Sequence, residues 1–266
     1  MLELTLKPLD LAQLDKLQQP DYTRQLDTLL PSINDLIASL PTTSPSNTSW
    51  HPRKLYSPKS YPTQTWSTAR GKVPPGTADT EHYKWHVRQS KLASQQGTYD
   101  QLKKGLLENH SLNEKEYIES CTEAKQLKVV FPGELEVWQT KYNNSPASNR
   151  DFTFALLTRE TTPSTSTTAP TPTSADSGAI VSPGSTPLRS FVVVSIPVNA
   201  PVEKGFVRGR YVSVEHVQET EEGGTVWTMA VSSDPGGWVP RLISDWVMPG
   251  KVSEDVPSFL EWMKER

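Results

Sequence analysis

The second half of the sequence changes from strand-like alternation to helical spacing, and this order restricts the fold more than any other feature of the 266-residue chain. Short apolar or alternating segments predict strands at 82–90, 127–131, 135–141, 151–158, 188–198, 206–218 and 225–233. Apolar residues then recur three and four positions apart from Trp238 to Val247 and from Val256 to Met263. We therefore expect an α+β fold in which a curved antiparallel sheet of about seven strands wraps a long C-terminal helix, with a cavity between them.

Residues 1–80 predict an N-terminal region made of helix and a proline-rich arm. Seven apolar residues from Leu26 to Leu40 form one stripe of a helix that is kinked near Pro31. Residues 41–75 contain seven prolines but also four tryptophan or tyrosine residues. We expect this arm to pack on the body of the protein, which residues 81–266 form.

Two helix starts are predicted after the first strand of the body. Thr98 with Gln101, and Ser111 with Glu114, have the spacing of capping boxes, in which two side chains bond free backbone amides reciprocally. The apolar face predicted for the second helix consists of Tyr117, Ile118, Cys121 and Ala124. We expect this face to bury the cysteine.

The segment 161–187 has a composition that cannot form a core. Serine, threonine or proline occupies 19 of its 27 positions, and it contains one charged residue and no aromatic residue. Such a segment buries too little apolar surface to offset the entropy lost on ordering, so we predict a disordered loop between two strands. One functional hypothesis is an interaction scaffold whose working part is this loop.

Charge and cysteine content exclude several classes of protein. With 27 basic and 30 acidic side chains, the net charge of −3 gives no electrostatic basis for binding nucleic acid. The single cysteine supplies neither a disulfide nor a zinc cluster of cysteines. No apolar run reaches the ~18 residues of a membrane span, and the N-terminus has no signal-peptide pattern. We therefore expect a cytoplasmic protein without stable membrane insertion.

Common catalytic, cofactor and metal motifs are absent from the sequence. It contains no Gly-x-Ser-x-Gly elbow, phosphate-binding loop, dinucleotide fingerprint or His-Glu-x-x-His pair. His82 and His86 have the spacing of two metal ligands on a helix, but the alternation around them predicts a strand. We expect no metal site and no cofactor, and we assign no catalytic residue. The sequence decides neither whether the protein is an enzyme nor its oligomeric state.

Six segments share a pattern with one known family. They are Trp85-His86-Val87-Arg88-Gln89-Ser90, residues 110–117, residues 207–215, Val226-Trp227-Thr228-Met229, Ser233-Asp234-Pro235-Gly236-Gly237-Trp238-Val239-Pro240 and residues 255–262. Together they resemble the fungal family DUF3074, which belongs to the START and Bet v 1-like (SRPBCC) superfamily of helix-grip folds. The resemblance covers most of residues 50–266. It implies a helix-grip fold and a hydrophobic ligand such as a lipid or sterol, and it implies no catalytic set.

We expect six residues to bind the ligand of this cavity. They are Arg88, Tyr211, Glu215, Trp227, Met229 and Trp246. Aromatic faces and flexible thioethers suit an apolar wall, whereas a hydroxyl group or a charge can orient a polar group of the ligand. Tyr211 and Glu215 share one face of their strand, as Trp227 and Met229 do on theirs. The sequence does not decide which pair faces the cavity.

The leading functional hypothesis is binding of a hydrophobic small molecule, such as a lipid, a sterol or a polyketide-like compound, for transfer or sequestration. Burying about ten methylene groups at ~0.8 kcal/mol each gives ~8 kcal/mol before the costs of association, so apolar walls suffice for useful affinity. The alternative is a cofactor-independent cyclase or pericyclase of fungal secondary metabolism, which would fold its substrate into a reactive conformer in the same cavity.

Overall fold

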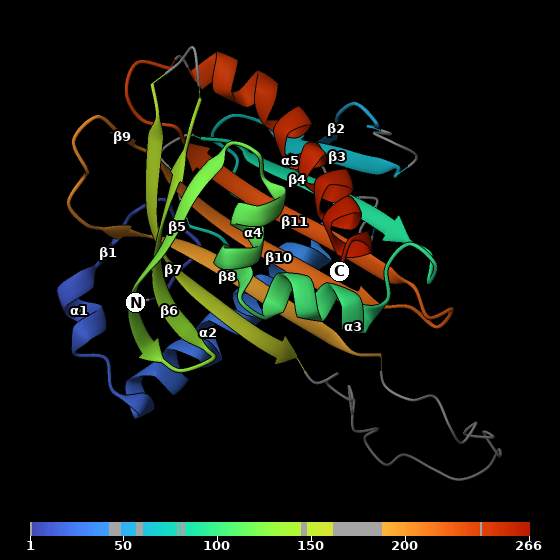
Figure 1. Ribbon diagram of the computed structural model, residues 1–266, viewed down its shortest axis with the longest axis horizontal. Helices are drawn as coiled ribbons and strands as arrows, with labels where there is room; N and C mark the ends of the chain where they lie inside the picture. Colours follow the sequence, from blue (N-terminus) through green and yellow to red (C-terminus); the bar gives the residue numbers. More distant parts are fainter. Residues whose placement is uncertain are drawn as a thin grey trace, which may run out of the picture.

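The protein is described by a computed structural model covering residues 2–42, 49–56, 61–78, 80, 83–144, 148–161, 188–239 and 241–266 (Figure 1). Its elements are β1 (Leu9–Asp10), α1 (Leu11–Asp15), α2 (Gln19–Ala38), β2 (Trp50–Pro52), β3 (Thr63–Thr68), β4 (Trp85–Leu92), α3 (Tyr99–Leu102), the π-helix η2 (Lys103–Leu107), α4 (His110–Tyr117), β5 (Cys121–Phe131), β6 (Leu135–Tyr142), β7 (Arg150–Thr161), β8 (Ser190–Asn199), β9 (Val207–Arg208), β10 (Arg210–Glu219), β11 (Thr225–Asp234) and α5 (Arg241–Lys264). The predicted α+β class is confirmed.

One curved sheet contains all strands of the described residues, in the order β2-β3-β4-β11-β10-β8-β7-β6-β5, with β1 paired to β8 and β9 to β7. Neighbours along this path are antiparallel, whereas β1 and β9 pair in parallel. The sheet therefore has eleven strands in the described chain, and the prediction of about seven was too low. The additional strands are short, and β2 and β3 lie in the proline-rich arm, where no apolar alternation marks them.

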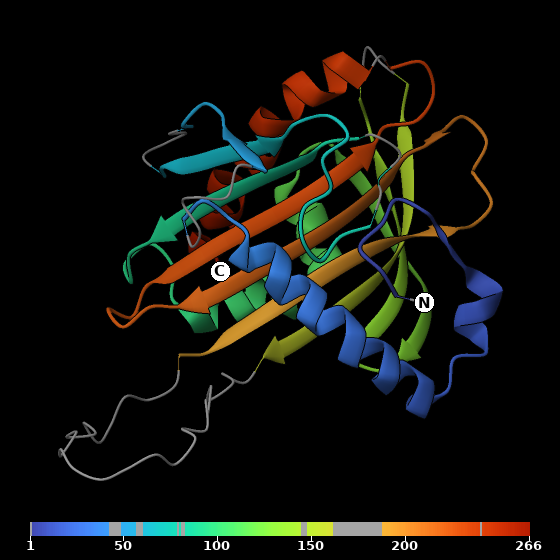
Figure 2. The ribbon, with the colours of Figure 1, turned by 180° about the vertical axis from the view of Figure 1, so that it is seen from behind.

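Helix α2 covers one face of the sheet, as the view from behind shows (Figure 2). It presents a buried stripe that includes Leu29, Ile33 and Leu36, as its helical spacing predicted. These residues pack against strand side chains such as Val194 and Val214 in a single apolar cluster. Pro31 lies inside this helix without ending it.

The opposite face of the sheet is covered by α5 together with α3, η2 and α4 (Figure 1). A second apolar cluster holds α5 there, and it includes Phe259 and Leu260 of the helix with Trp227 and Phe191 of the sheet. Cβ atoms alternate between the two faces along a strand, so neighbouring residues of a strand belong to different clusters. In β8, for example, Val192 and Val194 belong to the α2-side cluster, whereas Phe191 and Val193 belong to the α5-side cluster. The C-terminal helix packed on a curved sheet confirms the helix-grip prediction.

The helices between β4 and β5 confirm one of the two predicted capping boxes. Thr98 and Gln101 form a capping box at the start of α3. Helix α4 instead begins after Asn109, whose positive φ of 52° ends the preceding turn, and no side chain caps it. Ser111 therefore lies inside the helix rather than at its N-cap.

The prediction that Tyr117, Ile118, Cys121 and Ala124 form one face of a helix was wrong. Helix α4 ends at Tyr117, and Cys121 begins β5, where it pairs with Tyr142 of β6. The spacing of these apolar residues fits a helix and a strand equally over so few positions, and cross-strand pairing decided between them. Burial of the cysteine, which is 5% exposed, is confirmed.

Two sequence predictions lie outside the described residues. Strand β7 ends at Thr161 and β8 begins at Ser190, so the loop predicted at 161–187 falls almost wholly in the segment that is not described. The same is true of His82. Among the helices that are described, none combines the length and apolar character that crossing a bilayer requires.

Candidate functional site

A cavity of about 430 Å³ lies between the sheet, α4 and α5. Its walls include Tyr211, Ser213 and Glu215 of β10, Met229 and Val231 of β11, Glu114 and Tyr117 of α4, and Met248, Val252 and Asp255 of α5. Tyr142, Phe152 and Ser195 close it from β6, β7 and β8. The space therefore lies between the sheet and the C-terminal helix, where the sequence predicted it, and it is partly open to solvent.

Three of the predicted site residues form one row across the sheet. Met229 of β11 is the register partner of Arg88 on β4 and also of Glu215 on β10. Directly paired residues of neighbouring strands project from the same face, so these three side chains lie next to one another on the α5 side. The pairing of Glu215 with Met229 also shows that the β10 pair and the β11 pair, between which the sequence did not decide, lie on the same face of the sheet.

Arg88 is fully buried, and its three guanidinium nitrogens have no hydrogen-bond partner in the part of the chain that the structure describes. Its guanidinium carbon lies 4.0 Å from the centroid of the Trp227 ring, which gives a cation–π contact. The indole Nε1 of Trp227 in turn donates a hydrogen bond of 3.1 Å to Glu215. Neither Arg88 nor Trp227 lines the cavity itself. They lie behind the wall that Glu215 presents to it.

Three carboxyl groups from three different elements meet at the cavity. Burial raises the pKa of Asp255 to about 8; the charges of Glu114 and Glu215 raise it further and that of Arg88 opposes them. Burial also raises the pKa of Glu114, whose carboxylate accepts a hydrogen bond of 3.4 Å from the Tyr142 hydroxyl. At neutral pH Asp255 is mostly protonated, so its hydroxyl group can donate a hydrogen bond.

Tyrosine hydroxyl groups provide further hydrogen-bonding positions on the walls. Burial raises the pKa values of Tyr117, Tyr142 and Tyr211 well above their usual range, so each hydroxyl stays protonated and can donate. The ring of Phe152 lies between those of Tyr142 and Tyr211, with centroid distances of 5.6 and 5.4 Å. These edge-on contacts fix the ring positions, so this wall is stiff and aromatic.

The side of helix α5 that faces the cavity carries both apolar and acidic side chains. Met248, Val252 and Asp255 follow one another at spacings of four and three, which brings them onto one helical face. Sequence analysis missed Asp255 and also Glu114, because an acidic residue in a helix usually indicates a solvated face. The spacing of Asp255 from Met248 and Val252 was the signal that could have revealed it.

Trp246 is the one predicted site residue that the structure does not bring to this region. Its side chain is 81% exposed, and it is not among the cavity walls. The first turns of α5 face the body with Asp245 instead, which lies 3.7 Å from Arg70 and 3.9 Å from Lys84. This anchoring turns the tryptophan outward.

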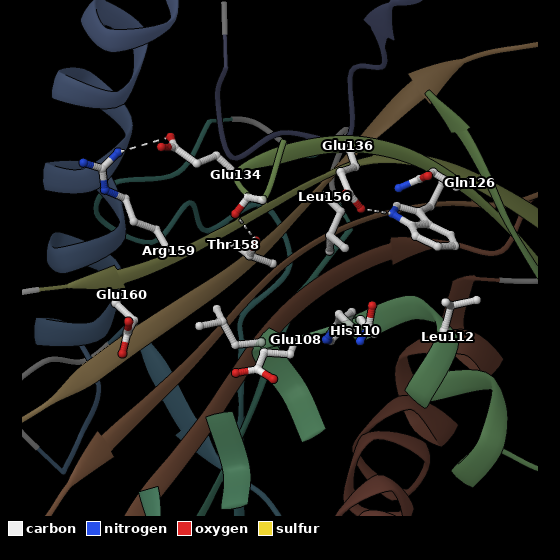
Figure 3. A pocket seen from close by; sticks show the side chains of 14 residues that line it. Glu108, His110, Leu112, Gln126, Glu134, Glu136, Leu156, Thr158, Arg159 and Glu160 are labelled. Atoms are coloured by element: carbon white, nitrogen blue, oxygen red, sulfur yellow. Dashed lines mark hydrogen bonds and ion pairs between the residues drawn. The ribbon is translucent and has the colours of Figure 1, made fainter. Parts of the chain in front are cut away.

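A larger cavity of about 730 Å³ lies on the same side of the sheet, beyond His110 (Figure 3). Figure 3 shows Glu134 and Glu136 on one side of it and Glu108 and His110 on the other. Three of its four carboxyl groups already have partners: Glu134 pairs with Arg159, Glu136 accepts from Trp138 Nε1, and Glu160 pairs with Lys103. Carboxyl groups that already form ion pairs or hydrogen bonds within the protein are less available to bind a ligand.

His110 separates the two cavities and contributes to the walls of both. Its Nδ1 atom lies 2.6 Å from the carbonyl oxygen of Leu106, and its Nε2 atom lies 3.9 Å from the Glu114 carboxylate. Within the described residues, no group of three or more histidine, cysteine or acidic side chains is arranged to hold a metal ion. We therefore place the candidate site in the 430 Å³ cavity.

Comparisons with known proteins agree with this geometry. A family model described as a protein of unknown function, DUF3074, matches residues 85–263. The uncharacterized protein C577.11 of Schizosaccharomyces pombe is 27% identical over 188 residues, which is 67% of either chain. The family resemblance predicted from the sequence is confirmed, and a fungal relative exists.

Solved structures with a similar fold come from the StAR-related group. Human StAR-related lipid transfer protein 5 superimposes with a TM-score of 0.59 at 12% identity, covering 90% of this chain and 98% of its own. Human STARD10 gives 0.56 at 13% identity, over 94% and 84%. A STAR-related lipid transfer protein from Xanthomonas axonopodis gives 0.55 at 13% identity, over 81% and 99%. At such low sequence identity, these superpositions establish a shared fold and no more.

Proposed function

The chain belongs to the DUF3074 family, and from this premise and its StAR-related fold we propose that it binds an amphipathic hydrophobic molecule in the 430 Å³ cavity, as a cytoplasmic carrier. The observation that carries the proposal is the unfilled space between sheet and α5. Protein interiors are otherwise packed with few voids larger than a water molecule. Two of the structures with a similar fold are named as lipid-transfer proteins.

The walls divide into an apolar part and a polar part. Met229, Val231, Met248 and Val252 offer flexible or branched apolar surface from the sheet and from α5. An aliphatic chain of about ten methylene groups placed against such walls would gain ~8 kcal/mol before the costs of association. In this proposal the polar residues, Glu215 among them, orient the ligand rather than supply most of its affinity.

Of the six residues predicted to bind the ligand, we propose direct contact for Tyr211, Glu215 and Met229. Arg88 and Trp227 lie behind the wall, where the indole hydrogen bond fixes the Glu215 carboxylate. Their role in this proposal is to position that carboxylate.

A cavity-filling variant tests the proposal. Ser213→Phe adds a ring inside the cavity, and Gln218→Phe adds the same ring at an exposed position of the same strand. Native mass spectrometry of the purified full chain should show a bound small molecule in the wild type and in Gln218→Phe. The signal should be lost in Ser213→Phe, while circular dichroism shows all three folded. Equal occupancy in all three proteins, or no bound mass in any, contradicts the proposal.

The convergence of polar groups favours a second candidate, the cofactor-independent cyclase or pericyclase. Asp255, protonated at neutral pH, and Glu215 are on opposite walls of one cavity, the arrangement that a proton-transfer reaction uses. Product analysis after incubation with polyketide-like substrates tests this candidate. Turnover that is lost in Glu215→Gln and reduced in Tyr211→Phe and Arg88→Ala supports it, and rates equal to the wild type in all three exclude those residues from the mechanism.

A further inference from the structure

The cavity has an unusual excess of acidic groups for a site that holds an apolar molecule. Five carboxyl groups line it, those of Glu114, Glu119, Glu215, Glu254 and Asp255, against one ammonium group. That ammonium group, of Lys251, lies 3.1 Å from Glu254. The deeper carboxyl groups of Glu114, Glu215 and Asp255 face the same space, and the one lysine among the lining residues is paired with Glu254.

These three carboxyl groups act on one another, and within the described residues neither Glu215 nor Asp255 has an ion-pair partner. The charge of Glu215 raises the pKa of Glu114, and both of these charges raise the pKa of Asp255. Glu114 has a single weak contact to a basic group, the 3.9 Å approach of His110. Groups of like charge in a water-poor site are stabilised by any cation that enters it.

Arg88 does not neutralise these carboxyl groups. It is fully buried and projects from the cavity side of the sheet next to Met229, and its guanidinium nitrogens have no hydrogen-bond partner among the described residues. Its charge reaches Asp255 and Tyr117 on the cavity walls. Within the described chain it forms no ion pair with a carboxylate, and its guanidinium group stacks on the Trp227 ring behind the wall. A molecule in the cavity therefore meets the carboxyl groups before it meets the guanidinium group.

The aromatic wall is also suited to a cation. The rings of Tyr142, Phe152 and Tyr211 follow one another at centroid distances of 5.6 and 5.4 Å, and the ring of Tyr117 faces the space from α4. Aromatic faces attract cations more strongly when water is excluded. An alkyl ammonium group has three donors in a compact head, which matches three carboxyl groups arranged around it.

We propose that the ligand of this cavity is a cationic amphiphile, an alkyl amine whose ammonium group lies among Glu114, Glu215 and Asp255 and whose chain extends along Met229 and Met248. This inference rests on the proposed function and specifies the chemical class of its ligand. The ammonium group is the counter-ion of the three carboxyl groups, and the chain occupies the apolar part of the walls. The selectivity comes from charge, and most of the affinity comes from the chain.

Three probes that share a twelve-carbon chain test the inference: dodecylamine, dodecan-1-ol and dodecanoate. Each is titrated into the full-length protein by calorimetry at pH 7, below its aggregation concentration. We expect dodecylamine to bind about tenfold more tightly than the alcohol, because a charge-assisted hydrogen bond is stronger than a neutral one, and dodecanoate to bind most weakly. An alcohol that binds as tightly as the amine, or a carboxylate that binds most tightly, overturns the inference and leaves the proposed function intact.

Carboxamide variants locate the effect. Glu215→Gln and Asp255→Asn should each weaken dodecylamine about tenfold and leave dodecan-1-ol within about twofold, because the volume of each side chain is kept. Glu222→Gln, in the exposed turn between β10 and β11, is the control for charge alone. Unchanged amine affinity in both cavity variants overturns the inference. If none of the three probes binds the wild type, the proposed function fails together with the inference.

Discussion

The two faces of the sheet are made by the same strands, yet one is filled and the other is partly open. Under α2, Val212 and Val214 of β10 join an apolar cluster in which each buried residue touches others of its kind. Under α5, Ser213 and Glu215 of the same strand line a cavity of about 430 Å³. Neighbouring residues of β10 therefore face different environments: one side chain lies in a packed core, and the next lies on the polar wall of the cavity.

The difference shows how the protein divides stability from function. The α2 face supplies mostly apolar burial and contains no buried charge like that of Arg88, although the Tyr22 hydroxyl and the Trp85 Nε1 atom lie in its cluster with no hydrogen-bond partner among the described residues. The α5 face contains Arg88, whose guanidinium group likewise has no hydrogen-bond partner in the described chain, and Asp255 with a raised pKa, and both cost stability. Strained or unpaired groups persist where the surrounding structure holds them and function uses them.

The largest expected effect on stability comes from placing the same polar side chain on each of the two faces in turn. Val214→Asn places an amide group in the filled core and should lower the free energy of unfolding by about 3–5 kcal/mol, since apolar burial is lost and the amide lacks partners. Ser213→Asn, one residue away, should cost about 1 kcal/mol or less, because its amide faces the cavity. Urea unfolding followed by tryptophan fluorescence measures both, and equal losses would contradict the comparison.

A matched pair of valines measures packing on each face. Val194→Ala under α2 should cost about 2 kcal/mol, because it removes buried methyl groups and opens a new void. Val231→Ala should cost less than about 1 kcal/mol, because it enlarges a space that already exists. The midpoints of thermal unfolding of the two variants measure this difference. A decrease in the midpoint of Val231→Ala as large as that of Val194→Ala would mean that the α5 face is packed as tightly as the α2 face.

The pH dependence of stability tests the buried carboxyl group of the open face. The pKa of Asp255 is raised to about 8 in the folded protein by burial and by Glu114, Glu215 and Glu254, against the opposing charge of Arg88. The folded state thus binds a proton that the unfolded state releases, and this contribution to stability is lost as pH rises toward 8. Asp255→Asn should therefore gain stability over the wild type progressively from pH 4 to pH 8 and no further above it. A constant difference across this range would show that Asp255 titrates normally.

The smallest expected effect concerns how firmly α5 is attached. Asp245 lies 3.7 Å from Arg70, 3.9 Å from Lys84 and 3.7 Å from His86, and burial lowers the pKa of that histidine. Asp245→Asn should lower the free energy of unfolding by about 1 kcal/mol or less, because its contacts to Arg70 and Lys84 are long and partly exposed to solvent and contribute little.

Hydrogen exchange separates this local effect from a global one. Amides at the start of α5 should exchange faster in Asp245→Asn, whereas those of α2 should not change. Asp35→Asn, at an exposed position of α2, is the control. Faster exchange in both helices would mean that the cluster stabilises the whole fold rather than the attachment of α5.

Alternation and helical spacing predicted most of the body, because they report burial directly. The strands β4, β6, β8 and β11 and the helix α5 lie close to their predicted positions. The short strands β1, β2 and β3 were missed, because two of them lie in the proline-rich arm and all depend on pairing with distant strands. The extension of a helix through Cys121 failed for the same reason, since its pairing with Tyr142 is a tertiary contact.

The site was predictable where strand register carries it and unpredictable where helices do. Arg88, Glu215 and Met229 were chosen from alternation, and the register brings all three into one row. Asp255 comes from α5, and whether a helical carboxylate faces solvent or a cavity depends on how the helix is seated. Trp246 was misplaced by the same uncertainty, because the contacts of Asp245 set the rotation of the helix.

The methionine methyl groups give the most direct test of a ligand between the sheet and α5. Met229 and Met248 are on opposite walls of the cavity, while Met263 lies farther along α5 and is not part of its lining. The chain has four methionines, so a spectrum of ¹³C-methyl-labelled protein is simple to assign. On saturation with dodecylamine or dodecan-1-ol, whichever binds more tightly, the Met229 and Met248 signals should shift together and the Met263 signal should stay in place. A bound probe that leaves both cavity signals unchanged would contradict the account.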